Sequence, residues 1–177
     1  MEIKLLIESL LFVADEPVAI GRLASAIGVS RQAVEEALRE LNEEYECRGL
    51  RLQRKGEHVQ MVTAPEAAPY IERFLDLNMS SKLSPAALET LAIVAYQQPI
   101  TRAQIEAVRG VNCDSVLRTL ISKGLIEEVG RLPQAGRPIL YGTTFEFLQH
   151  FGLRSLDELP PLEEEGPATS FERILKE

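Results

Sequence analysis

Two cysteines and two histidines are the side chains in this sequence best suited to bind a metal ion or to act as nucleophile and base. They are Cys47, Cys113, His58 and His150. A zinc site needs several such ligands at short spacings, as in CxxC or HxxxH pairs, and these four form no such pair. We therefore expect no metal site. We also expect both cysteines to remain reduced thiols, as in a cytoplasmic protein.

Catalytic motifs are absent from the sequence as well. The chain has no GxSxG elbow to present a nucleophilic serine and no GxxxxGK[ST] loop to bind phosphates. Neither histidine has a serine or cysteine partner that the sequence identifies. We predict that the protein has no catalytic residues and no cofactor and is not an enzyme, so that any nucleotide hydrolysis in its pathway is done by a partner.

Basic side chains offer the remaining chemistry, which is contact with DNA phosphates. The candidates for weak DNA contact lie in the second half of the chain and are Arg118, Lys123, Arg131 and Arg137. In helix-turn-helix proteins, basic residues on the third helix and the wing reach DNA in this way. An ordinary solvated surface explains these four charges equally well.

Charge argues against DNA binding by the first half of the chain. Residues 1–79 carry 9 basic and 14 acidic side chains, residues 80–159 carry 8 of each, and the net charge of the chain is −8. The stretch from Arg31 to Arg48 holds six glutamates against three arginines and would repel phosphates. Because duplex binding draws much of its free energy from phosphate neutralisation, we expect little or no autonomous DNA binding.

The elements that must position these residues occur twice. Shifting the sequence by 82 residues superposes Leu6–Leu38 on Leu88–Leu120 without a gap. Apolar character is kept between the identical positions, so the buried face is repeated even where identity is lost. The identical pairs are Leu6 with Leu88, Pro17 with Pro99, Gly28 with Gly110, Val29 with Val111, Val34 with Val116, and Leu38 with Leu120.

Each copy has the pattern of a winged helix-turn-helix domain. In the first copy, apolar spacing predicts helices over roughly residues 3–14, 20–27 and 31–48, with Gly28 ending the second and Ser30 capping the third. Two strands around a tight turn then form the wing. A further helix closes the unit, with one apolar face made by Ala67, Tyr70, Ile71, Phe74 and Leu75.

The second copy repeats this order of elements. Its first helix begins at Ser84 and stops before Pro99, a capping box of Thr101 and Gln104 opens the second helix, and Asn112 caps the third. The strands LIEEVGR and PILYGT form a longer wing, and a short helix with apolar Phe147, Leu148 and Phe151 closes the unit. We therefore predict a mainly α chain with small β-hairpin wings, an α+β fold of two tandem winged helix-turn-helix domains.

We place the domains at residues 1–78 and 84–159, joined by a short linker. The remainder, 160–177, is acidic and is expected to be flexible until a short helix begins at the capping box of Thr169 and Glu172. That helix would carry a narrow apolar stripe, suited to docking or simply to a frayed terminus. Its members are Phe171, Ile174 and Leu175.

The N-terminus has an apolar stretch that resembles a targeting segment only superficially. Glu2 and Glu8 interrupt it, and no small-residue cleavage site follows. We expect neither a signal peptide nor a membrane span.

Protein interfaces favour exposed apolar and aromatic groups with few charges, and the second copy offers such residues. The candidates are Tyr96, Pro99, Ile100 and Tyr141, to which the wing residue Arg137 is added. The alternative for the apolar ones is packing in the core, and the sequence leaves both open.

The second copy also carries recognisable sequence blocks, LETLAIVAYQQPITR, RGV and GRPILYGTT. With these blocks, residues 83–160 closely resemble the segregation and condensation protein B family, ScpB. The resemblance extends more weakly over residues 1–78. Ala135 and Cys113 stand where the family usually has proline and serine.

This resemblance implies a non-enzymatic subunit of the bacterial SMC–ScpA–ScpB condensin complex, acting in chromosome condensation and segregation during cell division. It implies a homodimer formed by the N-terminal domain, with the C-terminal domain binding the kleisin ScpA. The SMC ATPase would be reached indirectly through ScpA, in the cytoplasm and at the nucleoid. The residues taken alone leave open a different class, a winged-helix DNA-binding transcriptional regulator.

Overall fold

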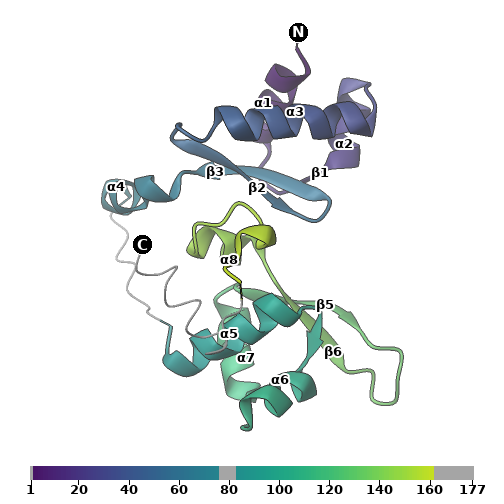
Figure 1. Ribbon diagram of the computed structural model, residues 1–177, viewed down its shortest axis with the longest axis vertical. Coiled ribbons are helices and arrows are strands. Elements are labelled where there is room, and N and C mark those ends of the chain that lie inside the picture. Colours follow the sequence, from purple (N-terminus) through teal and green to yellow (C-terminus); the bar gives the residue numbers. More distant parts are fainter. Residues whose placement is uncertain (1, 76–82, 162–177) are drawn as a thin grey trace. The chain divides into compact units, whose positions relative to one another are not determined.

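The computed structural model describes residues 2–75 and 83–161. Within them the chain forms two compact units, residues 2–75 with 152–157 and residues 83–151 with 158–161 (Figure 1). Residues 152–157 therefore group with the first unit, although the sequence-based boundaries include them in the second domain. Most of the predicted linker and the predicted tail helix, with Thr169 and Glu172, lie outside the described residues.

Three helices and a three-stranded antiparallel sheet build the first unit. The helices are α1 (Ile3–Val13), α2 (Ile20–Ile27) and α3 (Arg31–Glu44). The strands are β1 (Val18–Ala19), β2 (Leu50–Lys55) and β3 (His58–Thr63), in the order β1-β3-β2. Figure 1 shows the three helices gathered on one side of the sheet, with β2 and β3 as the wing.

Short-range sequence signals set the boundaries of the helix-turn-helix. Gly28 ends α2 with a φ of 80°, in the left-handed region that glycine adopts at little cost. Two residues later, the hydroxyl of Ser30 accepts a hydrogen bond of 3.2 Å from the N–H of Ala33 and so caps α3. The turn between the two helices is therefore fixed by local residues, as the sequence predicts.

The core of the first unit lies between the helices and the inner face of the sheet. Ile7 and Leu11 are the buried residues of α1, and they belong to one cluster with aliphatic side chains from the other two helices and the three strands. Each fully buried aliphatic side chain contributes roughly 2 kcal/mol to folding. The other buried aliphatic members are Val18, Ile20, Leu23, Ala24, Val34, Ala37, Leu38, Leu41, Leu52 and Val59.

Polar contacts tie α1 to α3 along the edge of this core. The ammonium group of Lys4 lies 2.6 Å from Glu44 and 3.1 Å from Glu40. Nearby, the hydroxyl of Tyr45 donates a 2.5 Å hydrogen bond to Oε1 of Glu8, and the tyrosine side chain is buried. These contacts fix how far the two helices are shifted along each other. Each side chain can reach its partner only from the helical turn on which it lies.

The helix that follows the wing forms but does not close the unit. After η1 (Pro65–Ala67), helix α4 spans Ala68–Phe74 and has no buried residue. Tyr70 and Phe74 are 69% and 85% exposed, and Leu75 is exposed as well. The prediction that its apolar face packs on the first domain is wrong, because the core is already filled by the three preceding helices.

The second unit repeats the same arrangement. It contains α5 (Pro85–Gln97), β4 (Ile100–Thr101), α6 (Arg102–Arg109), α7 (Asp114–Ser122), β5 (Ile126–Arg131), β6 (Ile139–Thr143) and α8 (Phe145–His150). The sheet order β4-β6-β5 matches that of the first unit. The 3-10 helix η2 (Leu156–Glu158) comes near the end of the described chain. The prediction of two tandem winged helices in an α+β chain is confirmed.

Two of the three caps predicted for the second unit's helices are present. Ser84 accepts a 3.2 Å hydrogen bond from the N–H of Ala87 at the start of α5. Thr101 and Gln104 form the predicted capping box at the start of α6. The first helix differs from its counterpart in burial, because α5 buries seven residues where α1 buries two.

The Tyr45 hydroxyl gives a test of the α1–α3 contact. Burial and, next, the hydrogen bond to Glu8 raise the pKa of Tyr45 from 10.0 to about 12. A tyrosine in the unfolded chain ionises at lower pH, so the stability due to the protonated hydroxyl is lost as pH rises from about 10 through about 12. Tyr45→Phe should lower the free energy of unfolding at pH 7 by about 1 kcal/mol and flatten this alkaline loss, as measured by urea unfolding.

The matched control is Tyr70→Phe on the exposed face of α4. It should change neither the stability at pH 7 nor the alkaline profile. An alkaline loss that persists unchanged in Tyr45→Phe contradicts the assignment.

Candidate functional site

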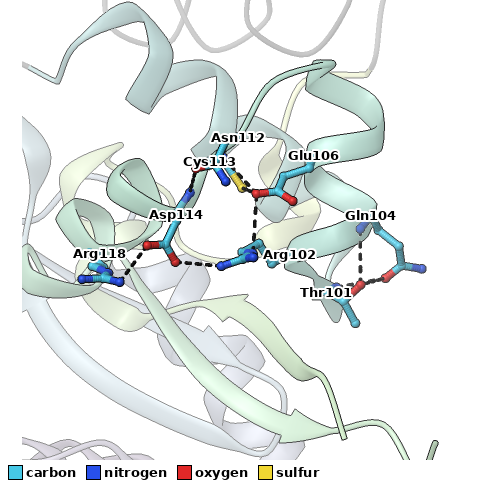
Figure 2. Close-up of polar contacts among 8 residues, drawn as sticks. All are labelled: Thr101, Arg102, Gln104, Glu106, Asn112, Cys113, Asp114 and Arg118. Carbon is cyan, nitrogen blue, oxygen red and sulfur yellow. Dashed lines mark hydrogen bonds and ion pairs between the residues drawn. The ribbon is translucent and has the colours of Figure 1, made fainter. Parts of the chain in front are cut away.

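At the start of the second unit's third helix, acidic side chains form ion pairs with basic groups of the kind that DNA binding would need. Asp114 opens α7, and its two carboxylate oxygens lie 2.8 Å from Nη1 of Arg102 and 2.7 Å from Nη2 of Arg118. Figure 2 shows this carboxylate between the two guanidinium groups. Arg102 is also 3.5 Å from Glu106. The predicted DNA-contact residue Arg118 is therefore paired with an acid on its own helix.

The turn before α7 is held by the same cluster. The side-chain oxygen of Asn112 accepts a 3.1 Å hydrogen bond from the N–H of Asp114. The N-cap of α7 is Cys113, whose side chain makes no cap hydrogen bond, so the prediction that Asn112 caps this helix is wrong. Glu106 accepts one of 3.1 Å from the N–H of Cys113, whose side chain is buried. Burial and the nearby Glu106 carboxylate raise the pKa of the Cys113 thiol. The thiol is therefore protonated at neutral pH and unsuited to act as a nucleophile.

The other predicted DNA-contact residues do not gather into a basic site. Arg131 on the wing is 3.6 Å from Glu128 of the same strand. Lys123 is exposed at the end of α7, and Arg137 is exposed in the wing loop with a φ of 40°. Acidic groups accompany the basic ones on α7 and β5, so the local field offers little attraction to phosphate. Over the described part of the chain, no group of three or more potential metal ligands occurs.

The predicted partner-binding residues divide between core and surface. Ile100 is 2% exposed and Tyr141 is 8% exposed, and the two face each other in the pairing of β4 with β6. They therefore pack in the core, which is the alternative that the sequence left open. Tyr96 is half-buried, and its hydroxyl donates a 2.5 Å hydrogen bond to the carbonyl of Pro160. Pro99 and Arg137 are exposed and available to a partner.

A network around Gln98 explains why the blocks QQPI and YGTT occur together in the sequence. The side-chain carbonyl of Gln98 accepts a 2.8 Å hydrogen bond from the N–H of Thr143, and its amide donates to the carbonyl of Ala95 at 3.0 Å. Gly142 leaves room for this contact, because a Cβ there would lie 2.8 Å from Val129 and 3.0 Å from Oε1 of Gln98. Sequence reasoning missed this role, since the partners are 45 residues apart.

Exposed apolar side chains on α1 form the clearest candidate interface of the first unit. Leu5, Phe12 and Val13 are 48%, 81% and 76% exposed. They recur at helical spacing on the side of α1 that faces away from buried Ile7 and Leu11. Sequence periodicity could not identify this face, because apolar residues occur all around the helix and a core face looks the same as an interface.

The second unit carries its own exposed apolar residues near the helix-turn-helix. Val108 at the end of α6 and Val111 in the following turn are 53% and 55% exposed, and Ile121 on α7 is 40% exposed. Large exposed apolar side chains of this kind mark protein interfaces more often than DNA contacts. No helix in the described residues is long and apolar enough to cross a membrane.

The fold and these surfaces define a class, a tandem winged-helix protein whose exposed groups suit protein partners better than DNA. The family model of the segregation and condensation complex subunit ScpB matches residues 5–162. The segregation and condensation protein B of Desulforamulus reducens is 51% identical over 89% of this chain and 88% of its own length. That of Moorella thermoacetica is 53% identical over 89% of this chain and 82% of its own length.

A solved structure of the same kind also resembles the chain. It is the crystal structure of a dimer of ScpB N-terminal domain complexed with ScpA peptide, with 30% identity over 40% of this chain and 88% of that chain and a TM-score of 0.38. By the family match and the identities, the chain belongs to the ScpB family of subunits of the segregation and condensation complex.

Replacement of Gln98 tests whether the shared blocks serve the fold. Gln98→Leu should remove the acceptor for the N–H of Thr143 and lower the free energy of unfolding by about 2 kcal/mol, because a buried donor is left unsatisfied. The drop is measured by urea or thermal unfolding. Gln97→Leu is the matched control, since its exposed side chain should leave stability within about 0.5 kcal/mol. Equal stability of the two variants would contradict the assignment.

Proposed function

We propose that this chain is a non-enzymatic scaffold that forms a homodimer through its first winged helix and binds the kleisin ScpA through its second. The observation that carries the proposal is the exposed apolar side chains on both units of a chain that belongs to the ScpB family. ATP hydrolysis would belong to an SMC partner reached through ScpA. The scaffold would work in the cytoplasm, at the nucleoid.

The dimer is assigned to the exposed face of α1. Phe12 is anchored on a helix whose opposite side is locked into the core by Ile7 and Leu11, so the face is rigid before association. A rigid aromatic anchor loses little conformational entropy on binding. The α4 face is less suited to this role, because α4 has no buried residue to hold it in place.

The kleisin surface is assigned to the second unit. It keeps Tyr96, Pro99 and Arg137 from the sequence-based set and adds the exposed Val108 and Val111. Ile100 and Tyr141 are left out because their side chains are buried. The mechanism is to hold the kleisin in a defined path, so that motion of the SMC arms is coupled to DNA handling.

Substitution of Phe12 tests the dimer. Wild type should have twice the 19.7 kDa mass of one chain in light scattering, and Phe12→Asp should have the mass of one chain, because a charge would be buried without a partner. Since Phe12 is 81% exposed, the variant should still fold. Val111→Asp is the matched control and should remain dimeric. Dimerisation of Phe12→Asp at the same concentration as wild type would sink this assignment.

The same two variants, with their roles exchanged, test kleisin binding. Wild type mixed with purified ScpA should form a co-complex, and Val111→Asp should bind ScpA at least about tenfold more weakly, the cost of one buried interface contact. Phe12→Asp should still bind ScpA as a monomer. If wild type forms no co-complex, the kleisin proposal fails; if Val111→Asp binds as well as wild type, the surface is wrong.

A further inference from the structure

The outer edge of β2 in the first unit is covered by a short piece of the chain from far along the sequence. In the order β1-β3-β2, strand β2 is an edge strand, with one side paired to β3 and the other free for a further strand. The N–H of Arg54 points outward and donates a 2.7 Å hydrogen bond to the carbonyl of Arg154. Residues 152–157, which we call the strap, thus bond an outward-facing N–H of an edge strand that has no strand partner on this side.

A buried polar side chain of β2 forms a hydrogen bond with the backbone of the strap. Gln53 is 2% exposed, and its amide donates a 2.7 Å hydrogen bond to the carbonyl of Leu153. The amide is oriented by Gln60 on β3, whose own amide donates to Oε1 of Gln53 at 3.0 Å. A buried glutamine on a sheet costs free energy unless its polar atoms are hydrogen-bonded. The amide of Gln53 therefore forms a binding site for a carbonyl of an adjacent main chain.

Two side chains of the strap add selectivity to these backbone contacts. Leu153 is 7% exposed, whereas the neighbouring Arg154 is half-buried, with its guanidinium 3.7 Å from Glu46. Gly152 precedes them with a φ of 66°, and a Cβ at this position would lie 3.1 Å from Pro65. The strap therefore begins with a backbone conformation that suits glycine. It then places a leucine followed by a basic residue against the edge of β2.

The corresponding edge of the second unit is built differently. Strand β5 has a register irregularity between Glu128 and Gly130, and its residues after Ile126 are exposed and partly charged. Bulges and charges are the usual devices that stop an edge strand from pairing. Strand β2 also carries the charged residues Arg51, Arg54 and Lys55, but it pairs with β3 in unbroken register over all six of its residues and has no bulge. The outer edge of β2 can therefore still pair with a further strand, and in this structure the strap lies against it.

We propose that the outer edge of β2 is a binding site for an extended peptide that carries a leucine followed by a basic residue, and that the strap occupies this site in the free chain. Such a peptide adds as a strand, with its main chain bonded to Arg54 and Gln53. The strap then acts as a resident competitor that must leave before a partner segment enters. This site does not depend on which surface binds ScpA.

The test releases the strap in the full-length chain and supplies its sequence in trans. Gly152→Val combines a β-branched residue at positive φ with a close contact to Pro65, and Leu153→Asp releases the strap by a second route should the first variant fold poorly. The probe is a fluorescently labelled peptide of residues 151–158, FGLRSLDE. The control peptide has aspartate in place of its leucine at position 153.

The labelled peptide should bind both released variants at least about tenfold more tightly than wild type, whose site is filled in cis. Adding Gln53→Met to the Gly152→Val variant should weaken this binding about tenfold, because one hydrogen bond to a buried group is lost. The control peptide should not bind. Hydrogen exchange at the N–H of Arg54 should be slow in wild type and fast in both released variants.

Three results would overturn the proposal. One is no peptide binding to released variants in which the N–H of Arg54 exchanges rapidly. Another is unchanged binding after Gln53→Met. The third is protection of the Arg54 N–H in wild type that rises with protein concentration, since a second copy would then supply the strap.

Discussion

A two-residue strand joins the helices of each unit to its wing, and both winged helices depend on that junction. In the first unit Val18 pairs with Val59, and in the second Ile100 pairs with Tyr141. Each strand leads directly into the second helix of its unit, so the pairing sets where the helix-turn-helix sits on the sheet. The side chains at these pairs are buried. These side chains therefore stabilise the fold and are not available to bind a partner.

This role in folding explains the most recognisable sequence blocks of the chain. The block around Gln98 and the block around Thr143 flank the β4–β6 pair, and the Gln98 side chain bonds the two together. Gly142 is required because its Cβ would collide with Val129. Residues that identify the family can thus serve the fold, and the partner surface must be sought among side chains that the fold leaves exposed.

In DNA-binding proteins the winged-helix fold inserts a helix into DNA, whereas in this chain the charges on that fold are balanced. Asp114 holds Arg102 and Arg118 at the start of α7, and the glutamates of α3 pair with Lys4, Arg39 and Arg54. Most of these pairs are exposed and add little to stability. Their effect is on the field, because several cations near the helix-turn-helix have an acid beside them. Apolar side chains remain as the main resource for binding, and these lie on α1 in one unit and around the α6–α7 turn in the other.

The sequence by itself determined the repeat, the class of fold and several local boundaries of its elements. An 82-residue offset, Gly28, Ser30 and the Thr101–Gln104 box are short-range signals, and a helix terminus depends on residues within one turn of it. The tertiary structure decided which apolar residues are core and which are surface. Phe12 and Ile100 look alike in sequence, yet one is 81% and the other 2% exposed. It also decided that Leu153 and Arg154 seat on β2, about 100 residues away, because burial and edge pairing depend on neighbours that are close only after the chain has folded.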